Sequence, residues 1–261
     1  MANQRVSFND VLSFSRASTA TYFDSSGVLQ TAAIDEPRRN HDPLTGEPLG
    51  VLIEPARTNL ALHSSDLMNS YWQINYHSSP AAREYYHDDK IPNAIVVLAT
   101  EDTLGGSVGF RRYFPIEGES LDLPATLSVL VKAGTRNNVT LSTSRIGSGT
   151  SSTFDLANLS VVHERAGNAS SISSKIEDAG DGWRRLSITR GALEGDYSSV
   201  SYSRLRIQTN LSEGEAENAG DVCFYVACPQ VEQGSFPTSY IPTAGAPVTR
   251  AADIITTRGD A

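Results

Sequence analysis

The chain has 261 residues, of which 39% are hydrophobic and 20% are charged, a balance typical of folded proteins and sufficient for one large or two modest domains. Its net charge is −9, and its basic residues occur singly or in pairs, which argues against nucleic acid as a partner. No segment reaches the roughly 20 apolar residues that a membrane helix needs, and residues 1–10 lack the basic start and apolar run of a signal peptide.

The first predicted segment, residues 1–62, is rich in turns. FDSSGVLQT (23–31) and DEPRRNHDPLTGEPLG (35–50) carry the Asp, Pro and Gly combinations that are typical of hairpins and loops. We expect a β-rich segment that serves attachment or oligomerisation. Glu54 and Arg57 flank a proline turn, where an Arg–carboxylate pair is expected to hold the chain.

Residues 63–243 have the rhythm of a β-sandwich. Short apolar stretches, most of them alternating or rich in β-branched residues, recur between Gly, Ser, Asn, Asp and Pro, and long helical patterns are nearly absent. This pattern favours an all-β, antiparallel two-sheet jelly-roll sandwich over βαβ units. The predicted strands include NAIVVLAT (93–100), ATLSVLVKAG (125–134), NVTLSTSR (138–145), WRRLSIT (183–189), SRLRIQTNL (203–211) and DVCFYVACPQV (221–231).

Two of these strands carry a more specific expectation. In WRRLSIT, Trp183 does not share the parity of Leu186 and Ile188, which predicts a bulge or twist between them. In DVCFYVACPQV, the odd spacing of Cys223 and Cys228 places the two thiols on opposite faces of the strand. Buried cysteines without a disulfide are therefore expected.

The chain closes with a strap and a connector. Residues 234–243 are predicted to form an extended strap that locks the last strand onto the sandwich, with Phe236, Tyr240 and Ile241 as apolar anchors. Residues 244–261 are expected to form an extended connector, or a strand that packs on another element.

Three stretches carry a family resemblance. The stretch from FSRASTATYF to LALHSSDL (14–67) resembles a segment of phage tail-fibre and head-fibre proteins and of gene-transfer-agent head spikes. ATLSVLVKAG (125–134) resembles the central strand of the carbohydrate-binding-module-like jelly rolls that follow that segment, and PQVEQGSFPTSYIPT with APVTRAAD (229–253) resembles their closing motif. The resemblance implies a virion surface protein whose jelly roll is related to polysaccharide-binding modules. It supplies no ligand, because the members differ in their binding loops.

The sequence offers no catalytic motif. It has no G-x-S-x-G elbow, no H-E-x-x-H, no zinc spacing of Cys and His, and no phosphate-binding loop. A glycosidase needs two carboxylates in one cleft, which sequence alone does not pair. We therefore expect a protein that is not an enzyme and has no cofactor, apart from the structural Ca²⁺ for which the resemblance to jelly-roll modules makes Asp66, Asp102 and Asp221 candidate ligands.

Aromatic and planar polar side chains indicate where a glycan would bind. Rings cover the apolar face of a sugar, while Arg, Asn and Asp read its hydroxyl groups. The stretches 70–89 and 109–116 hold both kinds of side chain, whereas Trp72 and Trp183 are expected in the core. The alternative is that the rings pack against the N-terminal segment or a neighbouring subunit. The predicted glycan-binding residues are Tyr76, Arg83, Tyr85, Tyr86, Arg111 and Tyr113.

Together these observations predict a virion fibre or spike protein that binds host cell-surface polysaccharide and serves adhesion. Two alternatives stay open: a purely structural virion adaptor or spacer, and a non-catalytic module or subunit of a polysaccharide-degrading enzyme. We expect other virion proteins as partners and a homo-oligomer, with a trimer favoured by the resemblance. The expected location is the surface of a phage or phage-like particle, after synthesis in the bacterial cytoplasm without a signal peptide or membrane insertion.

Overall fold

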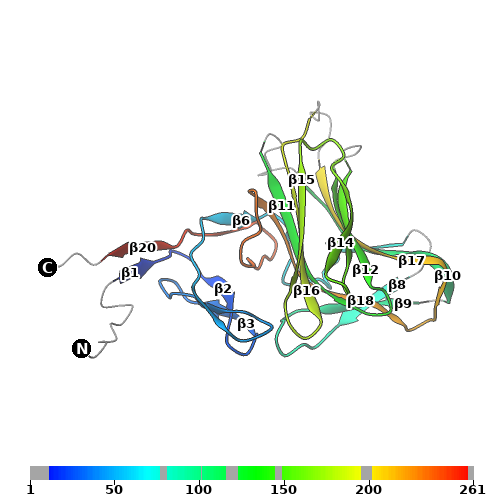
Figure 1. The fold of residues 1–261 in the computed structure, drawn as a ribbon, viewed down its shortest axis with the longest axis horizontal. Coiled ribbons are helices and arrows are strands. Elements are labelled where there is room, and N and C mark those ends of the chain that lie inside the picture. The colour runs from blue at the N-terminus through cyan, green and yellow to red at the C-terminus, as the bar shows by residue number, and fades with distance from the viewer. Residues whose placement is uncertain are drawn as a thin grey trace.

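The protein folds into a β-sandwich joined to a smaller layer of short strands (Figure 1). The computed structural model describes residues 12–76, 81–100, 102–115, 123–144, 149–194 and 202–257. Throughout these ranges the regular secondary structure is β-strand. Within them, no helix is long and apolar enough to cross a membrane. The predicted all-β, antiparallel two-sheet sandwich is confirmed.

Two six-stranded antiparallel sheets form the sandwich. Sheet I runs in the order β14 (Ser160–Arg165), β13 (Thr150–Asp155), β12 (Asn138–Ser144), β17 (Tyr202–Glu217), β10 (Thr103–Pro115) and β7 (Gln73–Tyr76). Sheet II runs in the order β15 (Ile172–Asp178), β16 (Trp183–Arg190), β11 (Ala125–Ala133), β18 (Val222–Gln233), β9 (Ile95–Ala99) and β8 (Ala81–Tyr85). Many neighbours within a sheet are distant in the chain, because the chain crosses repeatedly between the sheets, as in a jelly roll.

The space between the sheets holds the main hydrophobic core. On β11, Leu127, Val129 and Val131 face this core, as their shared parity predicts. Trp72, which was predicted as a core residue, is 1% exposed and packs here as well. Its indole donates to the carbonyl oxygen of His63 at 2.9 Å, which ties the turn before β7 to the sandwich.

Sheet II is covered on both faces. A second apolar cluster lies on the face turned away from sheet I; it contains Leu130, Trp183 and Cys228 and is contacted by Phe23 and Leu29 from the N-terminal segment. Because apolar side chains are needed on both of its faces, β18 is buried at nearly every residue rather than at alternate residues.

Burial on both faces also accounts for the apolar spacing in WRRLSIT. Of the bulge or twist predicted near Arg184 and Arg185, the bulge is wrong. β16 pairs with β11 in unbroken register along its whole length. Trp183 belongs to the second cluster, whereas Leu186 and Ile188 belong to the main core, so the change of parity reflects two buried faces. The cysteines are separated in the same way: Cys223 lies in the main core, Cys228 lies in the second cluster, and both are free, as predicted.

The N-terminal segment and the C-terminal end of the chain form a third layer. Two hairpins lie where the turn motifs predicted them: β2 (Ala20–Phe23) with β3 (Leu29–Ala32), and β4 (Arg39–His41) with β5 (Pro48–Val51). The C-terminal stretch supplies β19 (Val248–Arg250), which pairs with β6 (Arg57–Asn59), and β20 (Ile254–Thr257), which pairs with β1 (Leu12–Ser15). The β1–β20 ribbon lies at the end of the molecule remote from the sandwich (Figure 1).

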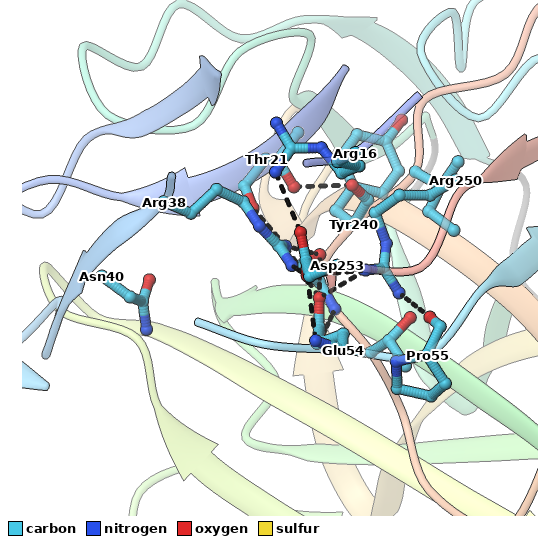
Figure 2. Close-up of polar contacts among 12 residues, drawn as sticks. Arg16, Thr21, Arg38, Asn40, Glu54, Pro55, Tyr240, Arg250 and Asp253 are labelled. Atoms are coloured by element: carbon cyan, nitrogen blue, oxygen red, sulfur yellow. Dashed lines mark hydrogen bonds and ion pairs between the residues drawn. The ribbon is translucent and has the colours of Figure 1, made fainter. Parts of the chain in front are cut away.

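Five charged side chains, four of them buried and Glu54 nearly so, lock the two ends of the chain together (Figure 2). Asp253 accepts hydrogen bonds from Arg16 Nη1 at 3.0 Å and from Arg38 Nη2 at 2.5 Å. Glu54 accepts a hydrogen bond from Arg38 Nη1 at 2.7 Å and lies 3.0 Å from Arg250 Nη1. We call this set the arginine cluster; it makes the third layer depend on both ends of the chain.

The predicted Glu54–Arg57 pair is wrong. Glu54 is used by the arginine cluster, while the guanidinium carbon of Arg57 lies 5.1 Å from the centroid of the Phe236 ring. Phe236 is 46% exposed and therefore does not anchor the strap. The other two predicted anchors do: Ile241 is buried and Tyr240 packs against the second cluster.

Candidate functional site

A cavity of about 160 Å³ lies between the third layer and the face of sheet II that is turned away from sheet I. Its wall combines aromatic rings with planar hydrogen-bonding groups. The N-terminal layer contributes Tyr22, Phe23, Asn40 and Glu54, and sheet II with the strap contributes Ser128, Arg185, Gln230 and Tyr240. Because these residues come from both ends and the middle of the sequence, the cavity exists only when the third layer is docked on sheet II.

Alternation along β11 brings Ser128 to the cavity. Leu127 faces the main core, so Ser128 belongs to the opposite face of the sheet, where the N-terminal layer covers it. On the other side, Asn40 Oδ1 accepts the backbone N–H of Phe23 at 3.0 Å, which fixes the Asn40 amide beside the β2–β3 hairpin. Figure 2 shows Tyr240 beside the arginine cluster and Asn40 at some distance from it.

Gln230 and Arg185 hold the strap against sheet II. Gln230 Nε2 donates to the carbonyl oxygens of Thr238 and Ser239, both at 3.2 Å, and Gln230 Oε1 accepts the backbone N–H of Ile241 at 2.6 Å. Arg185 Nη2 also donates to the carbonyl oxygen of Thr238. These hydrogen bonds replace the ladder that an extended strap lacks, and they close one wall of the cavity.

Glu54 is ionised, whereas the thiol in the wall is not. Burial acts to raise the pKa of Glu54, but Arg250, the Ser239 hydroxyl and Arg38 outweigh burial and hold that pKa below its ordinary value of 4.5. Burial raises the pKa of the Cys228 thiol to about 12, so this thiol stays protonated at neutral pH. The cavity therefore offers an anionic acceptor but no thiolate nucleophile.

Several polar groups in the wall are available to a ligand. Among the described residues, no hydrogen-bond partner is present for Asn40 Nδ2, Ser128 Oγ or the Tyr22 hydroxyl. Arg185 uses one Nη group on the strap. The wall thus retains donors and hydroxyl acceptors beside the rings of Tyr22 and Phe23, which is the combination that a small polyhydroxylated ligand requires.

The predicted binding residues Arg83 and Tyr85 of β8, and Tyr86 directly after it, have different surroundings. Tyr85 ends the strand and is 69% exposed. Tyr86 packs against Tyr225 with ring centroids 4.4 Å apart, and Lys132 lies over both rings. Arg83 donates to the carbonyl oxygens of residues 72, 68 and 69 at 2.8, 3.1 and 3.1 Å, so it braces β8 against the turn before β7. Of these three residues, Tyr85 is the one most open to solvent.

Tyr76, Arg111 and Tyr113 belong to the other sheet. The register places Tyr76 of β7 opposite Val108, and Arg111 of β10 opposite Arg206. The side chains of these three predicted residues lie outside the described part of the structure. The predicted glycan-binding set is therefore divided between sheets I and II, and a binding role for it stays a prediction.

The three candidate calcium ligands do not form one site. Asp102 Oδ1 accepts the backbone N–H of Ala219 at 2.8 Å, and Asp221 Oδ2 accepts that of Asn218 at 2.8 Å, so both carboxylates cap the turn between β17 and β18. Asp66 lies in the turn that precedes β7. In the described ranges, no three His, Cys, Asp or Glu residues come close enough to hold a metal ion.

Sequence reasoning did not find the cavity. Its polar residues stand singly in separate strands and turns, and no local motif connects them. One signal was present: DVCFYVACPQV has no polar face, which indicates a strand covered on both sides. A second cover on sheet II implies an interface, and interfaces between layers are where ligand cavities commonly form.

No protein-family model and no curated protein matches this sequence. Solved structures with a similar fold include TmCBM61 in complex with β-1,4-galactotriose, at 10% identity and a TM-score of 0.38, covering 67% of this chain and 99% of that chain. Another is the family 11 carbohydrate-binding module of Clostridium thermocellum in complex with a β-1,3-1,4-mixed-linked tetrasaccharide. Its identity is 13% and its TM-score is 0.28, and the match covers 60% of this chain and 96% of that chain. A third is tailspike protein 4 of bacteriophage CBA120, at 9% identity and a TM-score of 0.37, covering 66% of this chain and 21% of that chain.

Proposed function

We propose that the chain is a non-catalytic glycan-binding protein whose cavity holds one sugar unit of a host cell-surface polysaccharide. The observation that carries the proposal is the composition of the cavity wall. A pyranose ring has an apolar face and a rim of hydroxyl groups that both donate and accept hydrogen bonds. The rings of Tyr22 and Phe23 match the face, while Asn40, Ser128 and Arg185 match the rim.

The carboxylates of the cavity support binding rather than hydrolysis. Glycoside hydrolysis uses two carboxyl groups on either side of the scissile bond. Glu54 is the one acidic residue among the described residues that line the cavity, and it is already bound by Ser239 and the arginine cluster. A carboxylate held in this way accepts hydrogen bonds but does not supply a proton near neutral pH.

We further propose that the protein is displayed on a phage or phage-like particle as a homo-oligomer, with a trimer favoured, attached through residues 1–62. Support comes from the resemblance of residues 14–67 to fibre and spike segments and from the position of the β1–β20 ribbon at the end remote from the sandwich (Figure 1). Attachment there would leave the sandwich accessible to a cell surface. Sedimentation of the purified chain measures the oligomeric state, and a monomer at high concentration that binds no virion protein would contradict this proposal.

A cavity-filling variant tests the binding site. Ser128→Leu places an apolar side chain in the cavity from β11 and removes no hydrogen bond between described residues. Ser173→Leu is the matched control, because Ser173 is an exposed serine on β15 of the same sheet. On an array of uncharged host polysaccharide fragments, the parent and Ser173→Leu are expected to bind the same glycans and Ser128→Leu none. Equal binding by a folded Ser128→Leu would refute the cavity as the site.

A further inference from the structure

A second polar site lies on the surface of the third layer, beside β6. A shallow groove of about 210 Å³ is lined by Arg57, Thr58, Gln233 and Thr249 together with two apolar residues. Phe236, whose exposed ring lies under the Arg57 guanidinium, stands beside it. None of these residues lines the cavity described above.

The guanidinium group of Arg57 forms no ion pair with a described carboxylate. Its Nη1 donates to the carbonyl oxygen of Ala56 at 3.2 Å, while its Nε is buried without a hydrogen-bond partner. Within the described residues Arg57 has no carboxylate partner, in contrast to Arg16, Arg38 and Arg250, which share Glu54 and Asp253 in the arginine cluster. Because Nε is enclosed, a ligand can reach this cation only at its Nη atoms, where an anionic acceptor forms a charge-assisted hydrogen bond.

The backbone at Gly234 fixes the position of the Arg57 guanidinium. Gly234 has a φ of +151°, and a Cβ atom on it would lie 2.8 Å from Arg57 Nε and Nη2. Glycine is therefore required for the strap to pass beside the guanidinium. The guanidinium carbon lies 5.1 Å from the centroid of the Phe236 ring, a cation–π contact that leaves the Nη atoms able to donate to a planar acceptor.

The groove also offers an apolar surface and hydroxyl groups. Phe236 is nearly half exposed, and Thr58 Oγ1 lies 2.7 Å from Thr249 Oγ1 across the β6–β19 pair. One guanidinium matches the single carboxylate of one sugar unit. A carboxylate fits the planar fork of Arg57 and brings a single charge.

We propose that the Arg57 groove binds the carboxylate of an acidic sugar unit, of the uronic acid class. The carboxylate accepts from the Nη groups of Arg57, the sugar ring contacts Phe236, and the sugar hydroxyl groups form hydrogen bonds with the hydroxyl groups of Thr58 and Thr249. This inference rests on the proposed glycan-binding function for its ligand class, but the site is separate from the cavity. It makes acidic polysaccharides the preferred ligands of the protein.

Calorimetric titration with trigalacturonate, maltotriose and glucose 6-phosphate tests the inference on the full chain. Arg57→Gln is expected to weaken trigalacturonate binding by about tenfold or more, because a charge-assisted, bidentate interaction is lost. Arg57→Lys keeps the positive charge but not the planar, forked guanidinium group. Its affinity for trigalacturonate is expected to lie between those of the parent and Arg57→Gln. Arg39→Gln is the matched control, because Arg39 is an exposed arginine in the same layer, and it is expected to bind as the parent does. Raising the salt concentration weakens the carboxylate contribution and leaves maltotriose unaffected.

The two proposed sites are distinguished by their own variants. Loss of trigalacturonate binding in Arg57→Gln, with retention in Ser128→Leu, supports the groove whether or not the cavity binds sugar. Loss in Ser128→Leu with full retention in Arg57→Gln overturns the groove and leaves the cavity in place. The inference is also overturned if the parent binds no trigalacturonate, or if glucose 6-phosphate binds as tightly.

Discussion

Removing Asp253 tests whether the arginine cluster holds the third layer in place. Asp253 is buried and accepts from Arg16 at 3.0 Å, from Arg38 at 2.5 Å and from the backbone N–H of Glu54 at 2.9 Å. Asp253→Ala leaves two buried guanidinium groups short of an acceptor. Breaking a buried ion pair from one side costs about 3–5 kcal/mol. With a urea m-value of about 3 kcal/mol/M, the unfolding midpoint should fall by about 1–2 M.

The assay is equilibrium urea unfolding at neutral pH, followed by tryptophan fluorescence. Trp183 belongs to the cluster that the third layer covers, and Trp72 belongs to the main core. In a Trp183→Phe background only Trp72 fluoresces and reports global unfolding, so comparison with the two-tryptophan protein reveals loosening of the third layer. The matched control is Asp89→Ala, because the Asp89–His87 pair is almost fully exposed and contributes little. A midpoint for Asp253→Ala equal to that of the control would refute the reasoning.

Three further outcomes are expected. Because folding depresses the pKa of Glu54 below 4.5, its contribution to stability is complete above about that pH and is lost as the pH falls through the folded pKa; urea midpoints from pH 7 to pH 3 should show this loss, and Glu54→Gln should flatten it. Tyr86→Ala should destabilise the fold by about 2 kcal/mol by removing the packed ring contact with Tyr225, while Tyr85→Ala should change thermal stability by less than about 0.5 kcal/mol; equal losses would contradict these surroundings. Trp183→Phe removes the 2.9 Å indole hydrogen bond to Asp88 and should lower the free energy of unfolding in urea by about 1–3 kcal/mol; an unchanged value would contradict a role for this hydrogen bond.

The strands of the sandwich could be predicted because their signal is local. Leu127, Val129 and Val131 share one parity, and that period reports the face that packs on the main core without knowledge of the partner sheet. The second buried face of sheet II could not be predicted with the same ease. Trp183 does not share the parity of Leu186 and Ile188, because it packs under the third layer on the other face of the sheet. A bulge in the strand would produce the same spacing of apolar residues, so the sequence did not distinguish the two.

The charged and polar contacts of the third layer depend on long-range pairing, which sequence spacing does not encode. Glu54 and Arg57 are near neighbours in the chain, yet Glu54 is bound by Arg38 and Arg250, which a hairpin and a C-terminal strand bring to it. The cavity could not be predicted from the sequence for the same reason. Its donors and rings become neighbours only after residues from both chain ends have packed on sheet II.

A crystal structure of the protein with the oligosaccharide that binds best on the glycan array would show where the sugar lies. The account predicts a sugar ring in the cavity between the β2–β3 hairpin and sheet II, within hydrogen-bond distance of Asn40 and Arg185. An empty cavity, with the oligosaccharide bound at the exposed Tyr85 of β8 or elsewhere on the sandwich, would contradict it.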